Sequence, residues 1–236
     1  MTAVPGFLAR LFRLQAAQEL RYPVAFVTNL LAAAVFLALL AFAGRAVSGA
    51  HSPVPLLLGF MVMVSLQNPS RIVEDPAGAP EECMLSRWTL TGLMILETLA
   101  RGLWMTLQLS LTFVLLLLPL GLEAQELRTF FQWAPLAWWV GLGPGLMLAS
   151  ATLLFKRTGA LLNLVSLLVL GGAVLPVGAG WVGYVFPYVE LLALVRGAPG
   201  SAGGAWIAAT AWVLVGVLLL RAAERYGARH GLLGVR

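Results

Sequence analysis

The sequence predicts an all-α integral membrane protein, and three observations support this fold class. Apolar residues make up 60% of the 236 residues and charged residues only 11%, against roughly 25% charged in a typical soluble domain. The apolar residues gather into six runs, each near the roughly 20 residues that a helix needs to cross a bilayer. The 15 basic residues lie mainly at the ends of these runs, where they orient membrane proteins. We therefore expect no nucleic-acid partner.

The same composition excludes other classes of protein. A chain of 25.2 kDa cannot bury so much apolar surface in a soluble globule, and the remainder would form patches prone to aggregation. Disorder requires low hydrophobicity and high charge, which is the reverse of this sequence. A disulfide scaffold requires paired cysteines, and Cys83 is the only one. Membrane lipid is the expected surrounding.

We expect six transmembrane helices within a single domain covering residues 1–236. Each contains mostly apolar residues over a length close to the hydrocarbon thickness of a bilayer. The run that begins at Val24 is longer than the core of a signal peptide, so we expect the first span to be retained. The six predicted spans are Pro23–Ala43, Pro53–Asn68, Leu99–Gly121, Pro135–Phe155, Gly159–Val177 and Gly204–Leu220.

The basic residues predict the orientation of these spans, because short cytoplasmic loops retain Lys and Arg. With the N-terminus inside, eleven basic residues lie on the inner side and three on the outer side, and Arg101 falls within a span, which completes the fifteen. We therefore expect a multi-pass protein of the plasma (inner) membrane with both termini in the cytoplasm. The inner residues are Arg10, Arg13, Arg21, Arg71, Arg87, Lys156, Arg157, Arg221, Arg225, Arg229 and Arg236, and the outer ones are Arg45, Arg128 and Arg196.

Residues 5–21 do not resemble a span. Pro5 suits the first position of a helix. Phe7, Leu8, Leu11 and Phe12 share one side of that helix, while the arginines gather on another. We expect a helix lying in the inner membrane interface; the alternative is a frayed terminal segment.

Residues 178–199 predict a helix that enters the outer leaflet and returns. Pro187 and Tyr188 open a segment with Glu190 in its first turn and Arg196 in its last, and both charges complement the helix dipole. Gly197 and Pro199 end it. About ten residues cannot cross a bilayer, and such backbone occurs in membranes only where protein or a water-filled cavity covers it.

Residues 71–87 form the longest predicted inner loop. The loop contains four of the ten acidic residues, Glu74, Asp75, Glu81 and Glu82. Pro80 followed by two glutamates is typical of a helix start, because the carboxylates lie near exposed backbone N–H groups. We expect a short acidic helix that protrudes into the cytoplasm.

Catalytic patterns are missing from the sequence. The only lysine, Lys156, follows Phe155, so the chain has no Walker-type phosphate loop. There is no H-E-x-x-H motif, and His51 and His230 fall on opposite predicted sides of the membrane. Cys83 has no second cysteine to pair with. We expect a protein that is not an enzyme and binds no cofactor or metal itself.

Glu97 and Arg101 are four residues apart in or near the third predicted span, so they share a helix face and can pair. Ionisable residues at membrane depth are candidates for transport, but a position near the inner end of the span favours a structural ion pair. In the fourth predicted span, Gly141 and Gly145 form a G-x-x-x-G pattern, which is typical of close helix packing.

Aromatic residues gather near the predicted outer interface. An aromatic belt at the headgroup level explains them without a ligand, although a lipid or an aromatic substrate could also use some of them. The residues are Trp133, Trp138, Trp139, Trp181, Tyr184, Tyr188 and Trp206.

The inner loop resembles that of the type-2 ABC exporter permeases. In that family an acidic start is often followed by a Gly-Thr-Leu-Glu-like stretch and then Leu-Leu-Ser-Pro. Here Gly78, Glu81, Leu85 and Ser86 fall where that pattern expects them, with Met84 before the leucine. The family's interfacial first helix, six spans and outer re-entrant helix are similar to the predicted elements. The family's inner turn near the fifth span is similar to Lys156-Arg157-Thr158-Gly159-Ala160 followed by Asn163.

The resemblance implies a function and partners. It implies the permease subunit of an ATP-driven exporter that works as a dimer of identical or paralogous permeases. The coupling residues would be Glu74, Asp75, Gly78, Glu81, Glu82, Met84, Leu85 and Ser86, which would contact a separate ATPase subunit that holds ATP and magnesium.

Three positions depart from the family pattern: Ala79 and Pro80 replace Thr and Leu, and Arg87 replaces Pro. They fall in the segment that contacts the ATPase in that family, so they bear on coupling strength or on pairing with a second permease. The small size of the chain is similar to that of the haem-exporter permeases, and drug, lipid and polysaccharide exporters remain alternatives.

Two other classes of protein are alternatives. A secondary transporter driven by an ion gradient predicts carboxylates within the membrane and helices broken at mid-depth; only Glu97 is available. A non-transporting scaffold could recruit a cytoplasmic protein through the acidic loop, but it has no need of an outer re-entrant helix.

Overall fold

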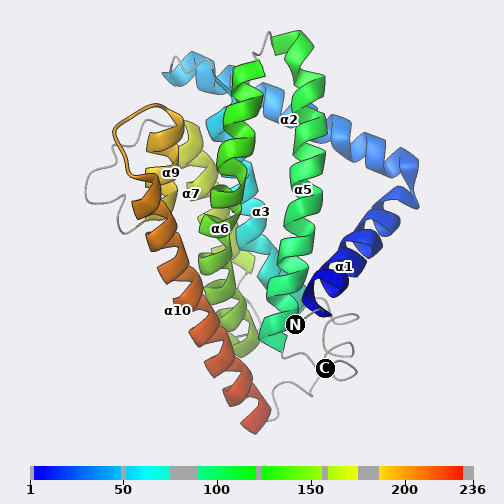
Figure 1. Cartoon of the computed structure of the whole chain (residues 1–236), viewed down its shortest axis with the longest axis vertical. Coiled ribbons are helices and arrows are strands. Elements are labelled where there is room, and N and C mark those ends of the chain that lie inside the picture. The colour runs from blue at the N-terminus through cyan, green and yellow to red at the C-terminus, as the bar shows by residue number, and fades with distance from the viewer. Residues whose placement is uncertain are drawn as a thin grey trace.

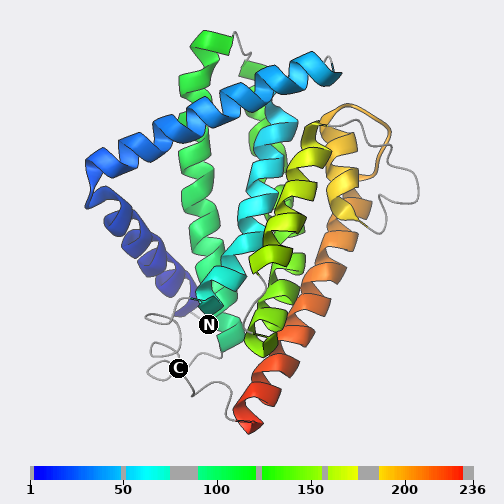
Figure 2. The same ribbon diagram turned by 180° about the vertical axis from the view of Figure 1, so that it is seen from behind.

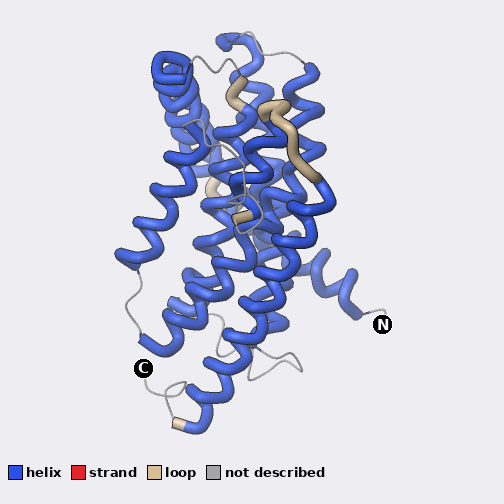
Figure 3. The backbone as a smooth tube through the Cα atoms, turned by 90° about the vertical axis from the view of Figure 1, so that its left-hand side faces the viewer, coloured by secondary structure: helices blue, strands red, loops and turns tan. Residues whose placement is uncertain are grey.

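The computed structural model describes residues 3–48, 52–74, 90–120, 124–155, 159–174 and 186–230, and these residues are all helical apart from short connections (Figure 3). This confirms the all-α class. The helices are α1 (Ala3–Leu20), α2 (Pro23–Ser48), α3 (Val54–Glu74), α5 (Leu90–Leu120), α6 (Ala124–Phe155), α7 (Gly159–Val174), α9 (Pro187–Val195) and α10 (Ala202–Arg229).

Five long helices run along one axis and alternate in direction (Figures 1 and 2). α3, α6 and α10 descend in the view of Figure 1, and α5 and α7 ascend. α3 and α6 therefore end at the lower end of the bundle, and α5 and α7 begin there. α9 and the start of α10 lie at the upper end (Figure 1).

Three helices in the described part of the chain are long and apolar enough to cross a bilayer. They are Val54–Val73 in α3, Ala124–Phe155 in α6 and Ala202–Gly227 in α10; Pro23–Phe36 and Gly159–Gly171 are shorter apolar helical stretches. These three helices indicate a multi-pass membrane protein, since a bilayer about 30 Å thick needs some 20 apolar residues per crossing.

Several predicted boundaries were wrong. α3 continues six residues beyond Asn68 and α10 nine residues beyond Leu220. α5 begins nine residues before Leu99, and α6 begins eleven residues before Pro135. The predicted spans ended at Asn68 and began at Pro135, whereas α3 continues through Asn68 and Pro69 and α6 contains Pro135 in its interior.

α2 also differs from expectation. It crosses the bundle obliquely near its upper end instead of running along the shared axis (Figures 1 and 2). Its apolar residues surround the whole helix, and side chains such as Val24, Val27 and Leu39 are exposed. A helix that is apolar on every side has no single face that selects a packing partner, so its sequence does not set its tilt.

The core lies where α6 contacts α3 and α10, and glycines let the backbones approach. A Cβ on Gly141 would overlap the Val62 carbonyl of α3, and one on Gly145 would lie 2.8 Å from the Leu66 carbonyl. On the other side, a Cβ on Gly143 would lie 2.7 Å from the Trp212 backbone of α10. The predicted G-x-x-x-G packing is therefore confirmed.

Pro69 contributes to this contact. A proline has no N–H, so Pro69 cannot bond the Ser65 carbonyl one turn earlier. That carbonyl lies against α6, 3.0 Å from the position of a Cβ on Gly145. The Ser65 hydroxyl donates a hydrogen bond of 2.7 Å to the Trp138 carbonyl of α6. α3 thus continues through Pro69, and the backbone of α6 lies beside the carbonyl that loses its helical partner.

Candidate functional site

The predicted inner loop lies mostly outside the described residues. Its first four residues, Arg71 to Glu74, belong to α3, so the loop begins later than expected. Arg71 bonds within its own helix, donating to the Gln67 side chain at 2.7 Å. Asp75, Gly78, Glu81, Glu82, Met84, Leu85 and Ser86 lie outside the described residues, as do Ala79, Pro80 and Arg87.

The helices that flank this loop are tied to the rest of the bundle. Gln67 on α3 donates to the Ser166 hydroxyl of α7 at 2.8 Å. The Thr91 hydroxyl, in the first turn of α5, donates to the Glu224 carboxylate of α10 at 3.0 Å. These two bonds connect the helices on either side of the loop to α7 and α10.

The Glu97–Arg101 pair is confirmed as an ion pair within α5, with 2.7 Å between the Arg101 Nη2 and the Glu97 Oε1. The side chains are 23% and 28% exposed, and the Arg101 Nε has no hydrogen-bond partner. Removing both charges from water is costly unless they neutralise each other. This geometry fits the structural interpretation of the pair better than a proton-carrying carboxylate.

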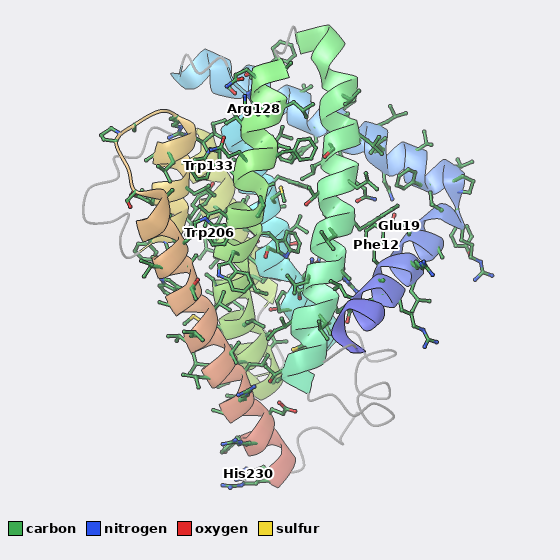
Figure 4. All side chains as sticks on the ribbon, in the orientation of Figure 1. Phe12, Glu19, Arg128, Trp133, Trp206 and His230 are labelled. Atoms are coloured by element: carbon green, nitrogen blue, oxygen red, sulfur yellow. The ribbon has the colours of Figure 1, made fainter. Side chains whose placement is uncertain are left out.

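An aromatic cluster one turn further along α5 was not predicted. Trp104 is buried and lies edge-on to Phe12 of α1, with ring centroids 5.8 Å apart, and beside Phe26 of α2 at 6.1 Å. Phe12 lies between α1 and α5 (Figure 4). Phe12 shares the apolar side of the first helix, which was the one sequence signal. The cluster attaches α1 and α2 to the bundle.

The predicted interfacial segment, residues 5–21, forms α1 almost as expected, with Arg21 in the turn after it. Arg10 and Arg13 are exposed, whereas Leu8, Leu11 and Phe12 are partly buried. One side of α1 therefore packs on α5 and the other carries charge, which is the amphipathic pattern that interfacial helices show.

α9 lies at the upper end of the bundle (Figure 1). It belongs to the predicted segment 178–199, of which residues 186–199 are described and contain the predicted short helix. Residues 178–185 lie outside the described residues. Pro187 occupies the first position of α9 and Glu190 its first turn, and Arg196 is its C-cap. Gly197 follows with a φ of 73°, a value that favours glycine. The amide of Ala198 donates to the Ala193 carbonyl at 2.9 Å, which closes the helix end.

Glu190 is buried, with 6% of its surface exposed, which the sequence did not predict. Its Oε1 accepts a hydrogen bond of 2.6 Å from the backbone N–H of Ser201, the N-cap of α10. Because a charged acceptor strengthens such a bond, Glu190 fastens α9 to the start of α10. The sequence signal was an acidic residue within an otherwise apolar helix.

Tyr188 fastens the other side of α9. Its hydroxyl donates a short hydrogen bond to the Val169 carbonyl of α7. This bond joins the first turn of α9 to α7.

The predicted aromatic belt is only partly correct. Trp133 lies below Arg128 in the upper part of the bundle, and Trp206 lies lower still (Figure 4). Trp138 instead lies in the core, where its indole packs directly on Gly102 of α5. The Trp139 Nε1 donates to the Thr210 hydroxyl of α10 at 3.1 Å. Gly102, a glycine inside a helix, was the signal for this close approach.

No group of His, Cys, Asp or Glu residues that could hold a metal ion occurs among residues 3–48, 52–74, 90–120, 124–155, 159–174 and 186–230. Comparison with protein-family models, with curated proteins and with solved structures gave no match. The functional conclusion therefore depends on the geometry and on the sequence resemblance.

Proposed function

We propose that this chain is the permease subunit of an ATP-driven exporter of the type-2 ABC class. Two permeases, identical or paralogous, would form the path. Each chain would cross the plasma (inner) membrane six times, with both termini in the cytoplasm. The segment 74–87 would dock a separate ATPase subunit, and that subunit would hold the ATP and magnesium.

The observation that supports this proposal most is α9. This helix of nine residues is too short to cross a bilayer, yet it is buried against α7 and α10 by Tyr188 and Glu190. It lies at the end of the bundle opposite the end of α3 and the start of α5 (Figure 1). A short buried helix on one side and an acidic loop on the other fit an exporter, which binds its ATPase on one side of the membrane and releases its cargo on the other.

The flanking contacts support a mechanism for coupling. The loop is preceded by α3 and followed by α5. α3 is packed on α6 through Gly141 and Gly145, and α5 is bonded to α10 through Thr91. Closure of the ATPase dimer would push the loop, and the packed helices would tilt as units because close-packed interfaces do not deform continuously.

The character of the path supports an apolar or amphipathic cargo. The path between permeases is expected to be lined by α2, α3 and α7; α2 and α7 carry exposed side chains, whereas the described side chains of α3 are buried or partly buried apart from Arg71. Exposed side chains of α2 and α7 include Leu31, Leu39, Leu164, Leu167 and Leu168. Such surfaces attract apolar groups rather than ions.

The proposal is tested by purifying the tagged protein in mild detergent from its native membrane and identifying the chains that accompany it. We expect an ATPase with a Walker loop, and its loss when Glu81→Lys and Glu82→Lys are combined. The matched control reverses Glu123 and Glu126, which precede or begin α6 at the other end of the bundle, and should keep the ATPase. An ATPase retained by the Glu81/Glu82 variant, or no ATPase at all, would contradict the proposal.

A second candidate function is ion-coupled secondary transport, and the buried Glu190 is the observation that favours it. Transport in proteoliposomes distinguishes the two. An ion-coupled carrier would accumulate cargo under an imposed proton gradient without ATP and would lose that response in Glu190→Gln. An exporter permease would not respond to the proton gradient. It would move cargo only when its ATPase and ATP were present. A scaffold, the third alternative, would move no cargo under either condition.

A further inference from the structure

One face of α10 carries apolar side chains along its upper part and arginines along its lower part. The apolar positions are Ile207, Leu214 and Leu218, and the basic ones are Arg221, Arg225 and Arg229. At 3.6 residues per turn, all six positions fall within a sector of about 80°. All six side chains are exposed, Ile207 at 74% and Leu218 at 66%.

The length of the apolar part matches one leaflet of a bilayer. Ile207 and Leu218 are eleven positions apart, or about 16 Å along a helix axis. Half of a hydrocarbon core of about 30 Å is nearly the same length. Arg221 follows Leu218 by three residues, which is less than one helical turn. The arginines are therefore at the depth of the lipid headgroups when the apolar part lies beside acyl chains.

The charge on this face is unopposed within the described residues. The one ion pair found among them joins Glu97 to Arg101, and none includes Arg221, Arg225 or Arg229. Glu224, the nearest acidic residue on the helix, points toward α5 and accepts the hydrogen bond from Thr91. The arginines at this depth therefore keep their donors for a ligand that supplies acceptor oxygens.

We propose that this face of α10 binds an anionic phospholipid of the leaflet at the lower end of the bundle. The phosphate oxygens contact Arg221, Arg225 and Arg229, and an acyl chain lies along Leu218, Leu214 and Ile207. Charge complementarity and the continuous apolar path select a lipid over a soluble phosphate compound, which would contact the arginines only. The inference rests on insertion in a membrane and not on the proposed transport.

The test is native mass spectrometry of the full chain released from nanodiscs that contain equal amounts of phosphatidylglycerol and phosphatidylcholine. We expect phosphatidylglycerol adducts to dominate. A basic residue near an anionic membrane surface is worth roughly a fivefold change in affinity, so Arg221→Gln, Arg225→Gln and Arg229→Gln together should reduce that preference on the order of a hundredfold. The corresponding triple lysine variant should keep most of it.

Two controls make the outcome specific. Arg128→Gln removes one exposed arginine at the opposite end of the bundle (Figure 4) and should leave the preference unchanged, whereas Arg225→Gln should reduce it. Inorganic phosphate added to the detergent solution should not displace the lipid. Equal adduct counts for the two lipids, or a preference that survives in the triple glutamine variant, would overturn the proposal, as would displacement by phosphate.

Discussion

The α3–α6–α10 core and the α1–α2 pair are both rich in apolar residues, yet they are attached to the bundle in different ways. In the core, Gly141, Gly143 and Gly145 bring backbones together, and Gly216 of α10 approaches the Gly143 carbonyl. α1 and α2 instead contact the bundle mainly along α5, where Trp104 joins Phe12 and Phe26. Most of the described side chains of α2 are exposed, and only Ala34 among them is buried.

The difference shows which sequence features specify packing in a membrane protein. Lipid tails are as apolar as leucine, so hydrophobicity alone does not draw helices together. Small residues at regular spacing and buried hydrogen bonds do specify a contact, and the core has both. α2 has Ala34 and Ala38 at such a spacing, but most of its described side chains are exposed and the Thr28 hydroxyl bonds the Val24 carbonyl of its own helix, so its surface suits lipid or a second permease. Changes to the core should therefore unfold the protein, and changes to the periphery should not.

The largest effect is expected from Gly145→Leu. A side chain there must displace the backbone of Leu66, because even a Cβ would lie 2.8 Å from its carbonyl. We expect a loss of about 3 kcal/mol or more in unfolding free energy, measured as a lowered thermal unfolding midpoint in detergent. Gly171→Leu on α7 is the matched control, since nothing lies within 4 Å of a Cβ at that position. Equal midpoints for the two variants would refute the glycine-mediated packing.

Breaking the Glu97–Arg101 pair should have the next largest effect. Glu97→Gln leaves a partly buried guanidinium without its counter-charge, so we expect a destabilisation of about 2 kcal/mol. The double variant Glu97→Gln/Arg101→Gln should recover most of the loss, because no unpaired charge remains. Thermal unfolding of the four proteins in a double-mutant cycle checks this. A coupling near zero would show that the pair contributes nothing to stability.

Ser65→Ala removes the hydrogen bond from α3 to the Trp138 carbonyl. Hydrogen bonds between membrane helices contribute about 0.6 kcal/mol on average, so the unfolding midpoint should fall slightly but measurably. Ser110→Ala is the control, since that hydroxyl bonds only its own helix, at the Thr106 carbonyl. If both variants unfold alike, the contact between α3 and α6 does not depend on this bond.

The smallest effect on global stability is expected from Trp104→Leu. The change removes the ring contacts with Phe12 and Phe26 but leaves the glycine contacts of α6 in place. We expect α1 to become more mobile while the free energy of global unfolding changes by less than about 0.5 kcal/mol, because α1 can detach locally from the core. Spin labels on α1 report the mobility, and amide hydrogen exchange along α1 provides a second readout. Immobile labels together with a large fall in the midpoint would place α1 in the core.

The sequence predicted the features that depend on local chemistry. Pro187, Glu190 and Gly197 indicated a short helix with defined ends, and α9 has those ends. The i, i+4 spacing of Glu97 and Arg101 predicted their pairing, and Gly141 and Gly145 predicted close packing. Each of these signals acts within one helix or through a spacing that is visible in the chain.

The features that the sequence did not predict depend on neighbours far along the chain. The second predicted span ended at Asn68, one residue before Pro69, whereas α3 continues through that proline and packs there on the backbone of α6, some 76 residues later. The burial of Glu190 depends on the amide of Ser201, and that of Trp138 depends on Gly102. The tilt of α2 has no signal at all, because its apolar residues surround the helix.

The proposed exporter requires the acidic loop and α9 to face opposite sides of the membrane, and thiol labelling tests this most directly. Cys83, the only cysteine, is a natural probe of the loop; Cys83→Ser with Ala198→Cys moves the probe to the exposed end of α9. A membrane-impermeant maleimide should label Cys83 only in inside-out vesicles and the Ala198→Cys variant only in intact cells or right-side-out vesicles. Labelling of both from the same side would contradict the proposed topology and the function built on it.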